Sequence, residues 1–548
     1  MKRPRIRVTV PAVVLIVLSG LLAACGGSSA TPTAKVAPAQ QQRVDVLHLA
    51  GTPNAWGYPT PFLFGDGVGN AFNSFVYDTL AWKDKNGKFI PLLATSWKTV
   101  ENGAAWDIQL RKGVKFSDGV PFTANDVAFT FWYMTQGAGK NTGDAFGHAV
   151  TSEKVVSPTE VIVGTGQPFG GMDEMILGLV HILPQHIWQN VSDPFSFNTP
   201  QAYIGTGPYD LVSADPTTGS YLFTARDGYF MGPPLVKRVE FAPAPTDPLS
   251  ALKTGTLDMA SIPQGAAPAS YAGFQTGDFT VVKGHGVGVA SIYFNWSRGF
   301  PYTDLNFRKA IAYGVNSNEI IQRALFGNAE LASYGGLPPS DVWTAKNLPT
   351  YSYDLNKAKS LLDQAGLKLV NGVRTLPNGQ PFAPTIVLSS TFNTSVAAMV
   401  KEYLLALGIN ATFQSLDNAS AGKAQAQGRY DMALVSTGPG VDPIDLSRVY
   451  MEKTNAVPGS WTVHGYDNPQ YAQLWEQQKS TADPTKRMQI VTQMEQITAR
   501  DVVKVDMYST YNMAAYRNSA GVQWYFVPAG TLDGYGGIIN KYILAVGK

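Results

Sequence analysis

The chain has 548 residues, 45% of them hydrophobic and 15% charged, and it is long enough that more than one hydrophobic core is expected. Its 42 basic residues exceed its 40 acidic ones, but four of the basic residues fall in residues 1–24; beyond these, 38 basic residues stand against 40 acidic ones, a formal charge of −2. A nearly neutral chain without a basic stripe argues against a nucleic-acid partner, and a single cysteine excludes intrachain disulfides.

The N-terminus has the pattern of a targeting segment. Four basic residues precede an apolar run over residues 8–22 and the string LAAC, which ends at Cys25. A basic start and a short apolar run are typical of a secretory signal, and LAAC resembles a bacterial lipobox. A transmembrane anchor, the alternative, needs about 20 apolar residues. We therefore predict a lipoprotein signal peptide over residues 1–24, then a lipidated cysteine and a disordered tether over residues 25–42.

The first elements predicted in the body are a strand over residues 45–49 and a helix over residues 71–80. A longer block follows at residues 105–131, with the sequence AWDIQLRKGVKFSDGVPFTANDVAFTF. Its first apolar side chains fall at every second position, which predicts a half-buried strand, and Ser-Asp-Gly is typical of a turn. Thr123 and Asp126 then predict a capping box at the start of a helix.

The histidines do not predict a metal site. His181 and His186 lie in the string HILPQHI, with a proline between them, at a spacing that does not place them on one helix face. The sequence has six histidines and one cysteine, and neither a His-x-x-Glu-His nor a Cys-x-x-Cys pattern. Neither a metal nor another cofactor is therefore predicted.

From about residue 287 the sequence predicts a further series of strands and helices. Several of these helices are preceded by Asp or Asn, whose short side chains accept hydrogen bonds from the first turn, and two of them begin with proline. The predicted capping residues are Asp304, Asn316, Asp354, Asn468 and Asp483.

Several of these strings, in this order, resemble signature segments of the family 5 extracellular solute-binding proteins, the peptide- and nickel-type binding components of ABC importers. The resemblance runs from about residue 90 to residue 481. The strings are PLLATSW at 91–97, the block at 105–131, HILPQHI at 181–187, GTGPY at 205–209, LNFRKAIAY at 305–313 and YDLNKAKSLL at 353–362.

The resemblance implies a two-lobed α/β fold like that of periplasmic binding proteins, of the type II or cluster C-like kind, with crossing hinge strands and a small inserted subdomain. A discontinuous domain I would comprise residues 43–286 and 505–548, with the inserted subdomain at about residues 71–203. Domain II would comprise residues 287–504. A ligand would lie in the cleft between the domains, which would close around it by a hinge motion.

The function that the resemblance implies is capture, not catalysis. The protein would be the extracytoplasmic substrate-binding component of an ABC importer, would take up di- or oligopeptides, and would deliver them to a membrane permease and its ATPase. It would act as a monomer, lipid-anchored to the cell membrane on the periplasmic or cell-surface side.

Three alternatives differ in ligand or in role. The first is the same transport role for a non-peptide ligand such as an oligosaccharide, and the second is a sensing lipoprotein on the same fold. The third is a surface hydrolase, against which the sequence offers no Gly-x-Ser-x-Gly elbow, phosphate loop or zinc motif.

One stretch departs from the pattern of the peptide-binding relatives. There, a segment resembling W-x-x-D-x-x-D/E-P follows a strand, and its first aspartate holds the ligand's amino group. Here the tryptophan is replaced by Ser436 or Thr437 and that aspartate by Pro439 or Gly440, whereas the final acidic residue is present as Asp442. Asp442 is therefore a candidate ligand anchor, and the alternative is that it only begins the next helix.

Five further residues are candidates for ligand contact. Trp296 and Trp461 lie outside the helix strings, and their rings suit peptide side chains or sugar rings, although packing is the usual role of tryptophan. Gly67 and Val68 match a cleft loop of domain I in the family. Tyr508 lies near a crossing segment.

Overall fold

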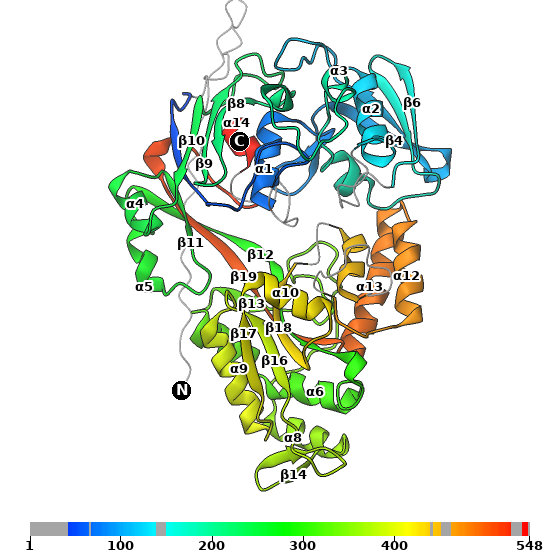
Figure 1. The fold of residues 1–548 in the computed structure, drawn as a ribbon, viewed down its shortest axis with the longest axis vertical. Helices are drawn as coiled ribbons and strands as arrows, with labels where there is room; N and C mark the ends of the chain where they lie inside the picture. The colour runs from blue at the N-terminus through cyan, green and yellow to red at the C-terminus, as the bar shows by residue number, and fades with distance from the viewer. Residues whose placement is uncertain are drawn as a thin grey trace, which may run out of the picture. The chain divides into compact units, whose positions relative to one another are not determined.

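The computed structural model describes residues 42–64, 67–138, 149–438, 442–450, 462–527 and 540–545. The strands of these residues form one seven-stranded sheet, two four-stranded sheets and two two-stranded sheets (Figure 1). Helices alternate with the strands along much of the chain, so the protein is α/β.

The first four-stranded sheet has the order β1-β10-β9-β8. Its strand β1 runs parallel to β10, and the other pairs are antiparallel. Phe72 and Phe75 of helix α1 pack against it, with Phe72 4.6 Å from Phe241 and Phe75 5.1 Å from Phe223 between ring centroids. This cluster of aromatic rings is the core of the sheet. The elements are β1 (Leu47–Gly51), β8 (Tyr209–Asp215), β9 (Ser220–Ala225), β10 (Arg238–Pro243), α1 (Gly67–Val76) and α14 (Lys541–Ala545).

The GTGPY string leads into this sheet, because β8 begins at Tyr209. A Cβ atom on Gly205 would lie 2.0 Å from the carbonyl oxygen of Val76, and one on Gly207 would lie 2.4 Å from that of Phe75. The two glycines therefore let the chain pass directly against the end of α1, where the Gly207 amide donates to the Val76 carbonyl at 2.8 Å. Residues with side chains do not fit there.

The second four-stranded sheet is antiparallel, with the order β4-β5-β7-β6. The predicted strand is β5, and the predicted capping box is present: Thr123 Oγ1 accepts from the Asn125 amide at 3.3 Å, and Asp126 Oδ2 accepts from the Thr123 amide at 2.8 Å. Helix α2, which this box begins, packs on β6 and β7. The elements are β4 (Ala94–Val100), β5 (Ala105–Leu110), β6 (Ser152–Ser157), β7 (Glu160–Gly164), α2 (Ala124–Thr135), α3 (Gln185–Trp188), η3 (Met172–Leu177), and the pair β2 (Ala81–Lys83) and β3 (Phe89–Pro91).

The seven-stranded sheet has the order β11-β19-β12-β18-β16-β17, with β13 also paired to β19. Apolar side chains are buried on both of its faces. Its strands are β11 (Met259–Ile262), β12 (Phe279–Phe294), β13 (Ala329–Leu331), β16 (Thr385–Ser389), β17 (Thr412–Leu416), β18 (Met432–Thr437) and β19 (Lys504–Arg517). The accompanying elements are α4 (Pro248–Thr254), α5 (Pro268–Tyr271), α6 (Leu305–Gly314), α7 (Ser317–Ala324), α8 (Leu355–Gln364), α9 (Thr394–Ala406), α10 (Asn418–Ala426), α11 (Ser447–Tyr450), α12 (Pro469–Lys479), α13 (Pro484–Asp501), β14 (Lys368–Val370) and β15 (Val373–Thr375).

The predicted helix caps are confirmed. Asp304, Asn316, Asp354, Asn468 and Asp483 each accept a hydrogen bond from an amide in the first turn of the helix that follows. The early elements are shifted from their predicted positions: the strand lies at Leu47–Gly51 and the helix at Gly67–Val76, a few residues before the predicted 71–80. Phe72 and Phe75, which pack on the first sheet, decide where that helix lies.

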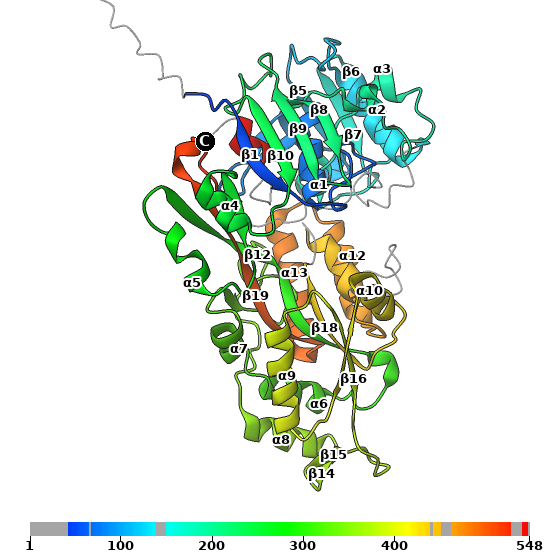
Figure 2. The ribbon, with the colours of Figure 1, turned by 60° about the vertical axis from the view of Figure 1, so that its left-hand side comes forward.

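Two long strands, β12 and β19, cross from one lobe to the other (Figures 1 and 2). At one end β19 pairs with β11, which contacts β1 of the first sheet; at the other end it pairs with β12 beside β18. We call the part with the two four-stranded sheets the first lobe and the part around β16, β17 and β18 the second lobe. The predicted two-lobed α/β fold with crossing strands is confirmed. The domain boundaries remain predictions, and the predicted boundary between residues 286 and 287 lies inside β12.

Candidate functional site

Arg487 of α13 connects the two lobes. Its guanidinium donates from Nη1 to the carbonyl oxygen of Gly170, in the first lobe, at 2.7 Å, and the Gly170 amide donates to the Lys479 carbonyl at 2.8 Å. The same guanidinium bonds the Gln478 side chain, from Nε at 3.0 Å and from Nη2 at 2.8 Å. We call these residues, together with Asp442, the Arg487 junction.

Asp442 is the acidic partner in this junction. Its Oδ2 accepts from Arg487 Nη1 at 2.8 Å, its Oδ1 accepts from Nη2, and the two side chains are only 1% and 2% exposed. Oδ1 also accepts from the Ile444 amide at 2.9 Å, so Asp442 caps the short helix η7 (Pro443–Leu446). Both oxygens are therefore engaged in a bidentate, charge-assisted pair, and a ligand amine reaches this carboxylate only if Arg487 leaves it.

One further buried carboxyl group, that of Asp341, lies next to the junction, and another, that of Glu495, lies further along α13. Asp341 accepts from the Trp343 amide at 2.8 Å, and the Trp343 ring lies 4.8 Å from the Arg487 guanidinium. Burial raises the pKa of Asp341, and the Asp442 charge raises it further. Glu495 of α13 accepts from the Ala345 amide at 2.5 Å, and burial raises its pKa to about 8. At neutral pH Glu495 therefore keeps its proton.

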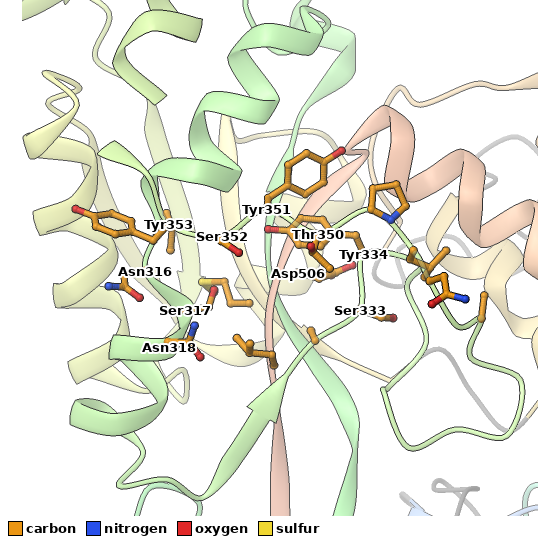
Figure 3. A pocket seen from close by; sticks show the side chains of 18 residues that line it. Asn316, Ser317, Asn318, Ser333, Tyr334, Thr350, Tyr351, Ser352, Tyr353 and Asp506 are labelled. Carbon is orange, nitrogen blue, oxygen red and sulfur yellow. The ribbon is translucent and has the colours of Figure 1, made fainter. Parts of the chain in front are cut away.

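A cavity of about 300 Å³ lies in the second lobe, between the start of α7, the segment after β13, the loop at residues 345–353 and strand β19 (Figure 3). We call it the Asp506 pocket. Its lining residues are Val315, Asn316, Ser317, Asn318, Leu331, Ala332, Ser333, Tyr334, Ala345, Asn347, Leu348, Pro349, Thr350, Tyr351, Ser352, Tyr353, Asp506 and Met507.

Asp506 is the acidic residue of this pocket. Its Oδ1 accepts from the Ser291 hydroxyl at 2.5 Å and from the Lys504 ammonium, whereas its buried Oδ2 has no hydrogen-bond partner in the described part of the chain. Burial lowers the pKa of Lys504, and the neighbouring Asp506 opposes that shift. Lys504 is therefore the direct ion-pair partner of Asp506 Oδ1, and the second carboxylate oxygen is enclosed by the protein.

The structure places the candidate ligand residues in different surroundings. Trp296 lies in η6 (Trp296–Arg298), where its Nε1 donates to the Val503 carbonyl at 3.2 Å and the Arg308 guanidinium lies 3.9 Å from its ring. Tyr508 is buried in β19, where it pairs with Leu331 of β13. Neither residue lines the Asp506 pocket.

The remaining candidates are placed only by the backbone or not at all. Gly67 and Val68 form the start of α1. Cys25 and Trp461 lie outside the described residues. Among the residues that are described, no group of three or more His, Cys, Asp or Glu side chains is arranged to hold a metal ion, and no helix is long and apolar enough to cross a membrane.

Two functional candidates were missed at the sequence level. Arg487 gave no signal, because a basic residue in an amphipathic helix usually faces solvent. Asp506 gave no signal either: it and Lys504 alternate with Val505 and Met507, a pattern that predicts a half-buried strand with its charged residues in solvent, whereas both side chains are buried.

A family model described as "Bacterial extracellular solute-binding proteins, family 5 Middle" matches residues 88–456. The nickel-binding periplasmic protein of Escherichia coli K12 is 28% identical over 385 residues, which are 68% of this chain and 71% of that protein. The oligopeptide-binding protein AppA of Bacillus subtilis 168 is 26% identical over 539 residues, which are 93% of this chain and 95% of that protein.

Solved structures agree with this match at the level of the fold. A periplasmic oligopeptide-binding protein of Thermotoga maritima superimposes with a TM-score of 0.77 at 23% identity, over 91% of this chain and 98% of the other. The Helicobacter pylori protein DppA, solved with the peptide STSA, superimposes with a TM-score of 0.73 at 21% identity over the same 91% and 98%. The chain belongs to the family 5 bacterial extracellular solute-binding proteins.

Proposed function

We propose that this protein is the extracytoplasmic binding component of an ABC importer and that it captures peptides between its two lobes. The family match over residues 88–456 carries the proposal. Two relatives point to peptides as the ligand: the B. subtilis protein, matched along 95% of its length, is named as oligopeptide-binding, and an E. coli protein 23% identical to this chain is named as dipeptide-binding.

The proposed mechanism is binding without turnover. The crossing strands β12 and β19 would act as the hinge, so that the lobes close on a peptide and open at the permease. Hydrogen bonds to the peptide main chain would hold ligands of different sequence, because they do not depend on the side chains. Our candidates for ligand contact remain Gly67, Val68, Trp296, Asp442, Trp461 and Tyr508.

Titration calorimetry with a panel of di- to pentapeptides tests the ligand class. We expect saturable binding of peptides, no cleavage products by mass spectrometry, and a smaller radius of gyration by X-ray scattering when peptide is present. Parallel titrations with oligosaccharides and with Ni²⁺ test the two alternative classes of ligand. Binding of a sugar or of nickel, with no binding of any peptide, would refute the peptide assignment.

We also propose that a lipid on Cys25 holds the protein at the outer face of the membrane, with residues 25–42 as a tether. The proposal is supported by the string LAAC after a basic and apolar start. A Cys25→Ala variant, expressed in a host that processes lipoproteins, should move from the membrane fraction to the soluble fraction. If the variant and the original chain both stay in the membrane fraction, the lipid anchor is wrong.

A further inference from the structure

The outer edge of β8 borders a groove in the first lobe. β8 is the last strand in the sheet order β1-β10-β9-β8, and β9 is its only strand partner in the described part of the chain (Figure 2). The groove has a volume of about 670 Å³, and residues 210–214 of β8 all line it. Because the side chains of a strand alternate between its two faces, these consecutive lining residues place the edge of the strand against the groove. We call this feature the β8 groove.

The main chain of β8 keeps hydrogen-bonding groups for one more strand. A strand at the edge of a sheet presents a row of unpaired amide and carbonyl groups on its outer side. Among the described residues, no backbone group of residues 210–214 forms a backbone hydrogen bond except within the β8–β9 pair. The register shifts between Leu211 and Ser213, and the side chain of Val212, which lies between them, is 56% exposed. An occupant of the groove therefore meets main-chain groups without a strand partner and an exposed apolar side chain.

The size of the groove fits a single extended segment. Five residues of a strand are about 17 Å long, so the volume of the groove corresponds to a cross-section of about 40 Å². One strand in packed sheets occupies about 4.8 Å by 10 Å, which is a similar area. The remaining lining comes from Tyr58, from residues 117–118 and from the segment 198–204, which includes the helix η4 (Pro200–Tyr203). These walls leave room for one strand and not for the edge of a second sheet.

An accessible carboxylate determines which charge the occupant carries. The lining contains Asp118 and Asp210 and no lysine, arginine or histidine. Both oxygens of Asp118 are engaged, Oδ2 by His186 at 2.7 Å and Oδ1 by the Val120 amide at 3.1 Å. The Asp210 side chain is 49% exposed, and Arg226, which donates to three backbone carbonyls, approaches it only to 3.8 Å. A basic side chain can therefore reach Asp210, and an acidic one would be repelled.

We propose that the β8 groove binds an extended segment of a partner protein, about five residues long, which adds to β8 as a further strand and places a lysine or arginine side chain at Asp210. Main-chain hydrogen bonds supply the affinity, and the contacts with Val212 and Asp210 supply the selectivity. The groove is lined by residues of the first lobe alone. It is therefore separate from the peptide site proposed between the lobes and does not depend on it.

Photo-cross-linking with short peptides tests the site on the full chain. The probe is the amidated pentapeptide acetyl-Thr-Lys-Bpa-Val-Thr, in which Bpa is the photoreactive residue p-benzoylphenylalanine. A second probe carries glutamate in place of lysine, and two more are N-methylated on alternate amides, so that each lacks the donors along one of its edges. Mass spectrometry of the digested protein maps where each probe attaches, which distinguishes the β8 groove from the space between the lobes.

The test variant fills the groove and has a matched control. Ser213→Trp places a large ring at an exposed position of β8 that lines the groove. Ser96→Trp makes the same change at an exposed position of β4, an edge strand of the other four-stranded sheet, outside the groove. Circular dichroism shows whether both variants are folded, and the methylated probes test the original chain without any substitution.

We expect saturable cross-links to residues 198–204 or 210–214 in the original chain and in Ser96→Trp, with a loss of about tenfold or more in Ser213→Trp. Only one of the two methylated probes should lose its attachment, because only one edge of an added strand faces β8. The glutamate probe should attach about two- to fivefold more weakly, as expected for an exposed ion pair.

The inference is overturned if cross-links fall only outside these residues, if they persist in Ser213→Trp, or if the two methylated probes do not differ. A dimer of the original chain, seen by sedimentation and lost in Ser213→Trp, would show that a second copy occupies the edge and would also overturn it. Peptide titrations of the same preparations measure capture between the lobes separately, so either proposal can fail without the other.

Discussion

Replacement of Asp442 by alanine separates the two roles considered for this carboxylate. In the structure its side chain is 1% exposed and binds Arg487 through both oxygens. The Asp442→Ala variant would leave the Arg487 guanidinium buried without its counter-charge. Removing one partner of a buried ion pair costs about 3–5 kcal/mol, so we expect a loss of that size in the free energy of unfolding.

The loss of the helix cap must be separated from the loss of the ion pair. Asp417 is the matched control, because it caps α10 through the Ser420 amide at 2.9 Å and is exposed, with no salt bridge in the described residues. Asp417→Ala should cost only about 1 kcal/mol, which is typical of a lost cap. The difference between the two alanine variants then measures the ion pair.

A double variant completes the experiment. Asp442→Ala combined with Arg487→Met removes both charges and fills part of the space with an apolar side chain, which in other buried pairs has been nearly neutral. The double variant should therefore be more stable than Asp442→Ala, and the cycle should give a coupling energy of about 1–3 kcal/mol between the two residues. Urea unfolding followed by circular dichroism measures all four proteins.

Stability and peptide affinity together decide between a structural Asp442 and a ligand anchor. If Asp442→Ala unfolds at the same urea concentration as the original chain and its peptide affinity falls steeply, Asp442 is a free ligand anchor. The Arg487 junction would then not exist in solution. If stability falls as expected and peptide affinity changes no more than in Arg487→Met, the carboxylate is structural.

Three further predictions concern buried groups. Burial raises the pKa of Glu495 from 4.5 to about 8, so the folded chain holds a proton that the unfolded chain releases between these two pH values. Stability is therefore lost as pH rises from 4.5 to about 8, and Glu495→Gln should abolish that loss in thermal unfolding. Burial lowers the pKa of His181 from 6.5 to about 3, so stability falls as pH drops below 6.5, and His181→Phe should flatten this acid limb. Gly205→Ala, whose Cβ would lie 2.0 Å from the Val76 oxygen, should cost about 1–3 kcal/mol in urea unfolding, whereas Gly228→Ala, with no atom within 4 Å, should cost much less.

The sequence predicts local structure well where a few neighbouring residues decide it. The Thr123 and Asp126 capping box forms because its two hydrogen bonds span three residues, and Asp354 caps α8 in the same way. Helix α1 lies before its predicted position, and its Phe72 and Phe75 pack against the first sheet. Its aromatic partner Phe241 is far away in the sequence.

The site residues depend on contacts between distant segments. Arg487 meets Asp442 from 45 residues away and Gly170 from 317 residues away, and Asp506 meets Ser291 from 215 residues away. The Asp506–Ser291 pair follows from the pairing of β19 with β12, whereas the contacts of Arg487 depend on how α13 packs against η7 and the first lobe. The motifs identify the family and therefore the sheet order, but a motif does not say which buried charges that order brings together.

The central claim is that the protein captures peptides, and the most direct test is mass spectrometry of what the purified protein releases on denaturation. We predict a series of short peptides of varied sequence, because main-chain contacts hold ligands without regard to their side chains. A single sugar or other non-peptide compound in the released fraction, with no peptides, would contradict the claim.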